Sequence, residues 1–312
     1  MINSTSKTEQ TDSWELHVSR WLQLFEQTIT RASTDTLQDL FHEDCHWRDL
    51  LAVTWHVKTV SGIHNILALI QALAAETRPY GFQIPQDHAA PRPVVRAGVD
   101  VIEAIFSFET NVGRSHGVIR LTPDTNNSGQ LKAWSLLTKL EELKGFEEQL
   151  GRHRPSGETY SRDFEGPNWL DLRNIDVRYE ERSPSVVVVG AGQAGLSVAA
   201  RLRQLQVDTL IVEQTDRVGD NWRNRYHALT LHNQVQVNHL LYMPFPPTWP
   251  TYIPKDKLAG WFETYAEAME LNVWTATEVG GGQSDPDKRR WSIELRSSDG
   301  RRQTLTPQHV VM

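Results

Sequence analysis

The sequence predicts two domains of different class, an α+β cone followed by an α/β domain. In the first part, stretches with helical spacing come before segments that alternate with a period of two, which is the order of an α+β cone. In the second part, the valine run Val186–Val189 leads directly into a glycine-rich turn and a further helical stretch. The 312 residues suffice for about two domains. We place the cone at residues 14–150, a linker at 151–185 and the α/β domain at 186–312.

The composition excludes several classes of protein. Charged residues make up 23% of the chain and its net charge is −7, with both signs spread along it, so it lacks the basic stripe of a nucleic-acid-binding protein. The polar residues 1–11 do not resemble a signal peptide, and the valine run is too short for an integral membrane segment. Cys45 is the only cysteine, so no internal disulfide requires an oxidising compartment. We therefore expect a cytoplasmic protein.

Periodicity defines the elements of the cone. Apolar residues such as Trp21 and Phe25 recur at helical spacing, and later segments alternate between apolar and polar residues. We expect helices over residues 14–31, from a cap at Ser33 or Asp35 to Phe41, and over 62–75, then strands over 99–108, 117–121 and 131–137, with a turn at 126–129.

Two histidines in the cone, His42 and His46, are four residues apart. On a helix this spacing could clamp a metal ion, but the run Trp47–Leu50 favours a strand, so we expect no metal site. His46 and Asp49 could instead line a pocket of the cone and perform acid–base chemistry. A purely structural role for both residues is the alternative.

The glycine-rich turn of the α/β domain predicts a dinucleotide site of the Rossmann type. The first glycine permits a tight turn, the second lets the backbone approach a pyrophosphate, and the third lets helix and strand pack closely. The pyrophosphate then meets the free N–H groups at the start of the helix. The turn consists of Gly190, Ala191, Gly192, Gln193, Ala194 and Gly195.

An acidic residue completes this pattern. The strand Thr209–Val212 is closed by Glu213, about 20 residues past the turn, where a carboxylate can bind the ribose hydroxyls. The same carboxylate would repel a 2′-phosphate, so we do not expect NADP at this turn. A glycine turn without a ligand is the alternative, and at this point FAD and NAD both remain open.

The residues after Glu213 resemble the second FAD signature of flavin-containing monooxygenases. That signature is an acid followed by a Gly-Gly-x-Trp stretch, and here Asp220 stands in place of the second glycine. Further stretches resemble the same class B enzymes, including the plant auxin-forming monooxygenases, so the resemblance covers 186–312 almost continuously. These stretches are Arg225-Tyr226, Leu229–Asn233, Pro244-Phe245-Pro246 and Pro254–Leu258.

The resemblance implies FAD as the cofactor and extends the candidate site. Asn221 and Trp222 would lie against the FAD, and His232 and Asn233 fall where the family contacts the flavin. His232 is also the candidate catalytic residue, because some members carry an Asn there close to the flavin's reactive carbon; a solvated or core histidine is the alternative. The remaining candidate cofactor-binding residues are Gln214 and Arg223.

The cone also carries a resemblance. The stretch His46–Leu51, followed by Trp55, Thr59 and Gly62, resembles the SnoaL-like domain that precedes some fungal and bacterial flavin monooxygenases. Together the two resemblances imply an enzyme that uses NADPH and molecular oxygen to oxygenate a small organic substrate, with a homodimer as a candidate assembly. The substrate and the type of oxygenation stay open.

Related enzymes continue past the position of Met312 with Ala-Thr-Gly and a second glycine-rich turn for NADPH. This chain stops in an apolar run, and Gly280–Gly282 is expected to be an exposed loop with no helix behind it. We therefore expect a truncated chain without the NADPH site; a natural short form is the alternative. Two other functions stay open: a non-catalytic FAD-binding protein or interaction module, and a cone-domain isomerase or cyclase with a flavin module attached.

Overall fold

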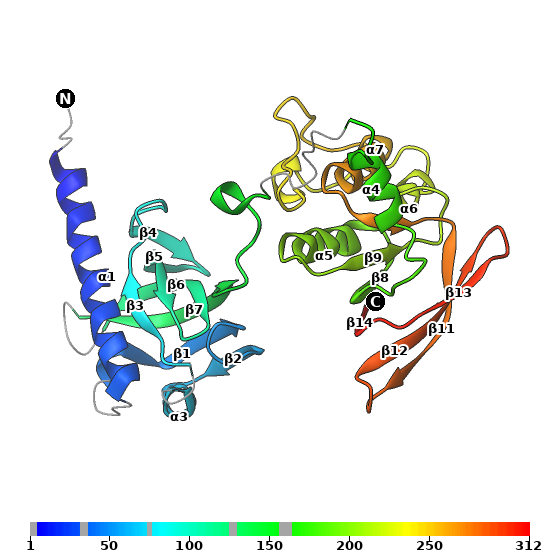
Figure 1. The fold of residues 1–312 in the computed structure, drawn as a ribbon. Helices are drawn as coiled ribbons and strands as arrows, with labels where there is room; N and C mark the ends of the chain where they lie inside the picture. Colours follow the sequence, from blue (N-terminus) through cyan, green and yellow to red (C-terminus); the bar gives the residue numbers. More distant parts are fainter. Residues whose placement is uncertain (1–4, 32–36, 74–76, 125–129, 156–163) are drawn as a thin grey trace. The chain divides into compact units, whose positions relative to one another are not determined.

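The chain forms two compact units in the computed structural model, unit 1 from Met1 to Glu147 and unit 2 from Glu148 to Met312 (Figure 1). The structure describes residues 5–31, 37–73, 77–124, 130–155 and 164–312. None of the helices in these ranges combines the length and the apolar character needed to span a bilayer.

Unit 1 is built around one mixed sheet. Its strand order is β2-β1-β7-β6-β5-β3, with β4 also paired to β5, and its one parallel pair among the described residues is β1 with β7. The elements are α1 (Thr5–Arg31), α2 (Leu37–Leu40), β1 (Phe41–Leu50), β2 (Val57–Ser61), α3 (Ile63–Leu73), β3 (Tyr80–Gln83), β4 (Arg92–Arg96), β5 (Val99–Glu109), β6 (Gly113–Pro123) and β7 (Leu131–Leu143).

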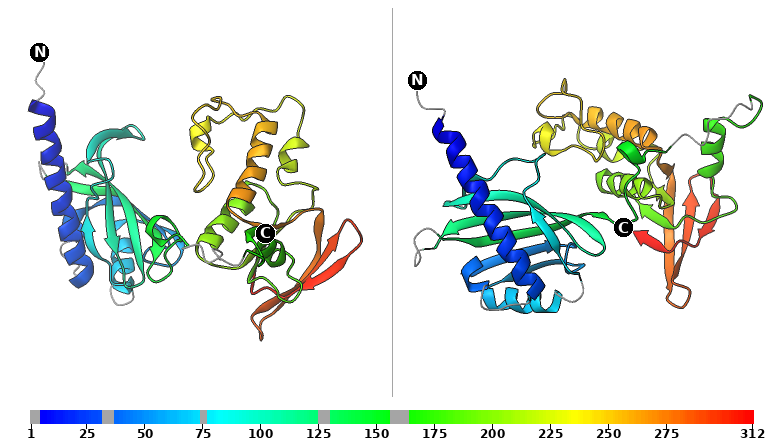
Figure 2. Two further views of the ribbon diagram at one scale, coloured as in Figure 1. Left: turned by 45° about the horizontal axis from the view of Figure 1, so that its top comes forward. Right: turned by 60° about the vertical axis from the view of Figure 1, so that its left-hand side comes forward.

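Helix α1 lies across one face of the sheet of unit 1 (Figure 2), and aromatic side chains of both elements fill the core. Phe106 and Phe108 on β5 point inward because alternate residues of a strand share a face. The ring of Phe82 stacks on that of Phe108 with centroids 4.8 Å apart, and the ring of Phe25 meets Phe82 edge-on. The core therefore joins the helices and the sheet, as the α+β prediction requires.

The second helix of unit 1 ends close to the expected position near Phe41. It ends at Leu40, and Phe41 already begins β1, where its side chain is buried in the core. The expected caps Ser33 and Asp35 lie outside the described residues, and so does the expected turn at 126–129.

Unit 2 contains a parallel sheet of order β10-β9-β8-β14 and a separate antiparallel sheet of order β11-β12-β13. Its helices are α4 (Trp169–Asp176), α5 (Gln193–Gln204), α6 (Asp220–Arg223) and α7 (Lys255–Ala268), with 3-10 turns at Gly151–His153 and Val235–Val237. Its strands are β8 (Val186–Val189), β9 (Thr209–Val212), β10 (Asn272–Trp274), β11 (Thr277–Asp285), β12 (Arg290–Ser297), β13 (Arg302–Leu305) and β14 (His309–Val311).

The pleat of β8 divides unit 2 into layers. Val186 and Val188 pack in the cluster that contains apolar residues of α5 and α7. Val187 faces the other way and packs with Ile293 and Leu305 of the antiparallel sheet. In the parallel sheet, β8, β9 and β10 lie side by side in chain order, and β14 lies on the other side of β8. This is the Rossmann arrangement that the sequence predicts.

The segment expected to be a linker, 151–185, contains the helix α4, which packs on unit 2. Asn168 caps the helix and Asp171 completes a capping box. The indole Nε1 of Trp274 donates to the carbonyl oxygen of Val177 at 2.7 Å, so the end of this segment lies against the edge strand β10.

The expected loop at Gly280–Gly282 is part of β11, so this prediction is wrong. Gly281 pairs with Glu294 and Gly282 with Ile293 across an antiparallel hairpin, after a register shift that follows Val279. Pairing with β12 supplies the backbone hydrogen bonds that fix an otherwise permissive glycine run.

Candidate cofactor site

The glycine turn lies at the carboxyl end of β8, an inner strand of the parallel sheet (Figure 1). Gly190 has a φ of 97°, which favours glycine, and its N–H donates to the carbonyl oxygen of Val212 at 2.7 Å. The chain then reaches Gly192, which stands at the N-cap of α5. The turn therefore aims the start of α5 at the edge of the sheet where open α/β folds bind ligands.

Gly195 is required by close packing. A Cβ atom on Gly195 would lie 2.0 Å from the carbonyl oxygen of Gly190, so any side chain there would force α5 away from the turn. Beside Gly192, by contrast, the nearest atom to such a Cβ is the side-chain Nδ2 of Asn221, at 3.4 Å. Gly195 therefore lets α5 pack closely on the turn, and Gly192 leaves space beside the backbone next to the side-chain amide of Asn221.

The first turn of α5 faces solvent. Gln193 and Ala194 are exposed, and the first N–H groups of any helix lack partners within the helix. Such groups, with the positive end of the helix dipole, bind phosphate oxygens. The residues present therefore fit a dinucleotide pyrophosphate.

Glu213 is buried, with 7% of its surface exposed, and its carboxylate organises the turn. Oε2 accepts the backbone N–H of Ala191 at 2.7 Å, while Oε1 accepts both the N–H and the hydroxyl of Thr215 at 2.9 and 2.8 Å. A carboxylate offers about four lone-pair sites, so these three bonds leave one for a ribose hydroxyl. Sequence reasoning missed Thr215, although a hydroxyl residue two places after the acid was the available signal.

The short helix α6 carries the residues of the second signature and is held on α7. Gly219 has a φ of 90°, and a Cβ there would lie 2.5 Å from the carbonyl oxygen of Ala259. Arg223 donates to Asp220 at 2.9 Å and to Glu263 at 2.5 Å, which ties α6 to α7. Arg223, expected to bind the cofactor, thus has its guanidinium occupied by two carboxylates of the protein.

Asp220, which departs from the family's glycine, has a structural task. It is buried, accepts the backbone N–H of Arg217 at 3.1 Å and pairs with Arg223. The hydrogen bond from Arg223 lowers the pKa of the Asp220 carboxyl, so the group is charged at neutral pH. The substitution closes the loop before α6 rather than opening it.

Trp222 offers a donor to a ligand. Its ring packs against the core of unit 2, and its Nε1 is buried without a hydrogen-bond partner among the described residues. A buried donor without a partner is costly, so a cofactor acceptor at this place would stabilise the site. Asn221 is exposed beside the glycine turn, as the contact with Gly192 indicates.

The other candidates lie on the surface of unit 2. The side chains of His232, Asn233 and Gln214 are exposed, and within the described ranges His232 makes no hydrogen bond or ion pair. The segment before His232 is fixed, because the N–H of Leu231 donates to the carbonyl oxygen of Ile253 at 2.9 Å.

The two residues proposed for a pocket in the cone do not face each other. Asp49 points into unit 1 with 1% of its surface exposed. Its carboxylate accepts hydrogen bonds from four donors, the backbone N–H groups of Val53 and Thr54 and the hydroxyls of Thr54 and Thr138. His46 is half-buried on the other face of β1 and contacts Ser61. Within the described part of the chain no cluster of three or more ligating side chains could hold a metal ion.

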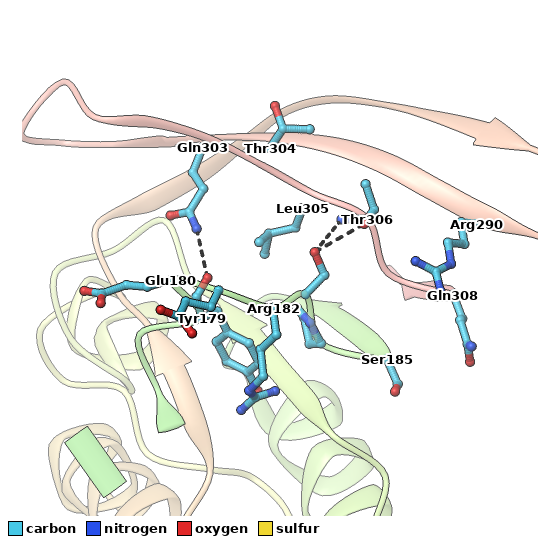
Figure 3. A pocket seen from close by; sticks show the side chains of 13 residues that line it. Tyr179, Glu180, Arg182, Ser185, Arg290, Gln303, Thr304, Leu305, Thr306 and Gln308 are labelled. Carbon is cyan, nitrogen blue, oxygen red and sulfur yellow. Dashed lines mark hydrogen bonds between the residues drawn. The ribbon is translucent and has the colours of Figure 1, made fainter. Parts of the chain in front are cut away.

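A polar pocket of about 420 Å³ lies elsewhere in unit 2 (Figure 3). Its lining includes Ser185, just before β8, and Gln308, just before β14, so it lies at the amino ends of the parallel strands. In its wall, the hydroxyl of Ser183 accepts the N–H of Thr306 at 3.0 Å. The pocket is therefore separate from the glycine turn, which lies at the carboxyl ends.

Comparison with known proteins places these features among dinucleotide-binding domains. Residues 188–242 match the family described as an NAD(P)-binding Rossmann-like domain. An indole-3-pyruvate monooxygenase of Oryza sativa subsp. japonica is 37% identical over 127 residues, which are 40% of this chain and 31% of that protein. An uncharacterised CzcO-like oxidoreductase of Geobacillus kaustophilus is 38% identical over 94 residues, 30% of this chain and 27% of that protein. The chain thus spans about a third of these relatives.

Among solved structures, the likeness is weaker. A flavin-containing monooxygenase of Stenotrophomonas maltophilia superposes with a TM-score of 0.36 and 21% identity, over 41% of this chain and 37% of that one.

Proposed function

We propose that this chain is the FAD-binding part of an NADPH- and oxygen-dependent flavin monooxygenase that oxygenates a small organic substrate. The observation that carries the proposal is the Glu213 carboxylate, which bonds the glycine turn and keeps one lone-pair site free at the place of a ribose. The 37% identity to a plant indole-3-pyruvate monooxygenase supports a flavin over a nicotinamide at this turn.

Different residues of the candidate site would bind different parts of FAD. Gly190–Gly195 and the start of α5 would hold the pyrophosphate, and Glu213 the ribose. The amide of Asn221 and the indole of Trp222 would contact the middle part of FAD, and His232 and Asn233 would lie toward its flavin ring. Bound FAD supplies the oxygenation chemistry, and NADPH the electrons; the protein binds, orients and shields.

The test is selective binding of the whole flavin dinucleotide. The full chain is freed of bound ligand and titrated with FAD, FMN and NAD⁺, each followed by calorimetry. We expect FAD to bind more tightly than FMN, because FMN lacks the ribose and pyrophosphate contacts, and more tightly than NAD⁺. Equal or tighter binding of NAD⁺, or no binding of FAD, would sink the proposal and leave only a Rossmann domain.

Finer features accompany the proposal. A SnoaL-like identity for unit 1 is supported by α1 and α3 packed with a mixed sheet around one core. A homodimer and a cytoplasmic location are expectations from the sequence. Sedimentation velocity of the full chain tests the first of these two, and fractionation of the source cells tests the second.

A further inference from the structure

Lys255 is a buried lysine at the junction of two segments of the candidate cofactor site. Only 7% of its surface is exposed. Burying an ammonium group costs free energy unless polar partners replace the lost water. Its Nζ donates to the backbone carbonyl oxygen of Arg223 at 2.8 Å and to the carboxylate of Asp256 at 2.9 Å. The side chain therefore reaches from the start of α7 back to the end of α6.

The first segment is α6, whose last residue is Arg223. Carbonyl groups in the last turn of a helix lack partners within the helix and carry the negative end of its dipole. A cation placed on such a carbonyl is favourable, so Lys255 fixes the end of α6. Asn221 and Trp222 lie in the same short helix, so a movement of α6 would move both residues.

The second segment leads to His232 and Asn233. The backbone N–H of Lys255 donates to the carbonyl oxygen of Leu229 at 3.0 Å. Thr230 forms an antiparallel bridge with Pro254. The main chain at Lys255 thus holds the segment before His232, while the side chain of the same residue holds α6.

We propose that Lys255 is a positioning residue that sets the spacing between α6 and the segment before His232, and with it the shape of the FAD site. This rests on the proposed function, because the spacing of α6 and the segment before His232 affects binding only if FAD lies between them. Lys255 acts through Arg223 and Leu229 and does not itself touch the cofactor. Loss of its ammonium removes one of the contacts that hold α6, while Arg223 still pairs with Glu263.

The test replaces the ammonium and keeps the hydrocarbon stem. K255M is compared with K257M, which removes an exposed lysine from the same turn of α7. If K255M leaves the binding arrangement populated about a tenth of the time, the FAD dissociation constant rises about tenfold. We expect this rise, together with weaker visible circular dichroism of the bound flavin. K257M should match the wild type, and K255R, which keeps a cation, should recover part of the loss.

The outcomes separate three cases. If the wild type binds no FAD, the proposed function fails and this inference fails with it. If the wild type binds FAD and K255M binds it within about twofold, with unchanged visible dichroism, only the inference is overturned. The same holds if K255M melts far lower without ligand yet binds normally in the cold. Should K255M not fold, K255Q is measured instead: a rise of about fivefold or more supports the inference, and a smaller one overturns it.

Discussion

The carboxylate of Glu213 and the backbone N–H of Ala191 are joined by a hydrogen bond of 2.7 Å between the ends of β9 and β8. The acid expected to bind the ribose therefore also fixes the glycine turn. If Glu213 also binds the ribose as proposed, the shape of the turn and the affinity for the cofactor will change together when this side chain is replaced.

Glu213→Ala should weaken FAD binding and the fold together. Three donors on Ala191 and Thr215 lose their acceptor, and a charged hydrogen bond is worth about 1.5–3 kcal/mol, so FAD affinity should fall roughly ten- to a hundredfold. Glu213→Gln should be almost as damaging, because an amide accepts at one end only. Calorimetric titration and denaturant unfolding check both effects. Glu267→Gln, on an exposed face of α7, is the control; unchanged affinity in the Glu213 variants would show that the acid does not hold the ribose.

Gly195→Ala should separate α5 from the turn. The new methyl group would lie 2.0 Å from the carbonyl oxygen of Gly190, and overpacking against backbone typically costs about 1–3 kcal/mol. We expect reduced stability and lost FAD binding, measured by thermal unfolding and titration. Gly260→Ala in α7 is the matched control: nothing lies within 4 Å of that position, so a gain of about 0.5–1 kcal/mol is expected. Equal behaviour of the two variants contradicts the packing argument.

The acid stability of unit 1 should depend on Glu103. Hydrogen bonds from Arg96 and then Arg120 lower its pKa from 4.5 to about 2. A depressed pKa stabilises the fold above the unfolded value of 4.5, and this contribution is lost as the pH falls toward 2. Both arginines are partly exposed, so we expect Glu103→Gln to cost about 1–3 kcal/mol at pH 7.

Urea unfolding at several pH values measures this effect. The gap in unfolding free energy between wild type and Glu103→Gln should be largest at pH 7 and shrink between pH 4.5 and 2. Glu43→Gln, at an exposed position of β1, should show no such pH dependence. A gap that stays constant down to pH 2 would contradict the role of Glu103.

Tyr179 should anchor α4 to unit 2. Its hydroxyl donates to Asp208 at 2.7 Å and accepts from Asn272 at 2.9 Å, so Tyr179→Phe should cost about 1–2 kcal/mol. Burial raises the pKa of Tyr179 above its usual value of 10, so the wild type loses stability as the pH rises past 10. The difference between wild type and variant should therefore narrow in alkali. Tyr252→Phe, at an exposed position, is the control, and a pH-independent difference argues against this role.

Much of unit 2 could be predicted because its signals lie next to one another in the chain. The valines of β8, the positive φ of Gly190 and the small third glycine each act within a few residues. Backbone geometry and helix–strand contact at such short range leave little choice of fold. Glu213 was predictable for the same reason, because a strand of ordinary length brings it back to the turn.

The rest depends on contacts between distant segments. Arg223 resembles a cofactor residue in the sequence, but its guanidinium is taken by Glu263, 40 residues later, a pairing that no local pattern encodes. Likewise the segment that forms α4 was expected to be a linker. Its Arg173 side chain donates to Asn272, which lies 99 residues later in the chain, so no local pattern indicates this contact. Sequence patterns show which residue types are present. The roles of Arg223 and Arg173 depend on which distant residue the fold places beside each of them.

The pairing of β14 with β8 has a consequence for how the protein is made. β8 leaves the ribosome well before its neighbour on one side, β14, because the strands β9 to β13 lie between them in the chain. Throughout the intervening synthesis, one edge of Val186–Val188 has no strand beside it, and an open valine-rich edge invites pairing with other nascent chains. Translation speed and chaperone capture over this interval should therefore set the yield of folded protein.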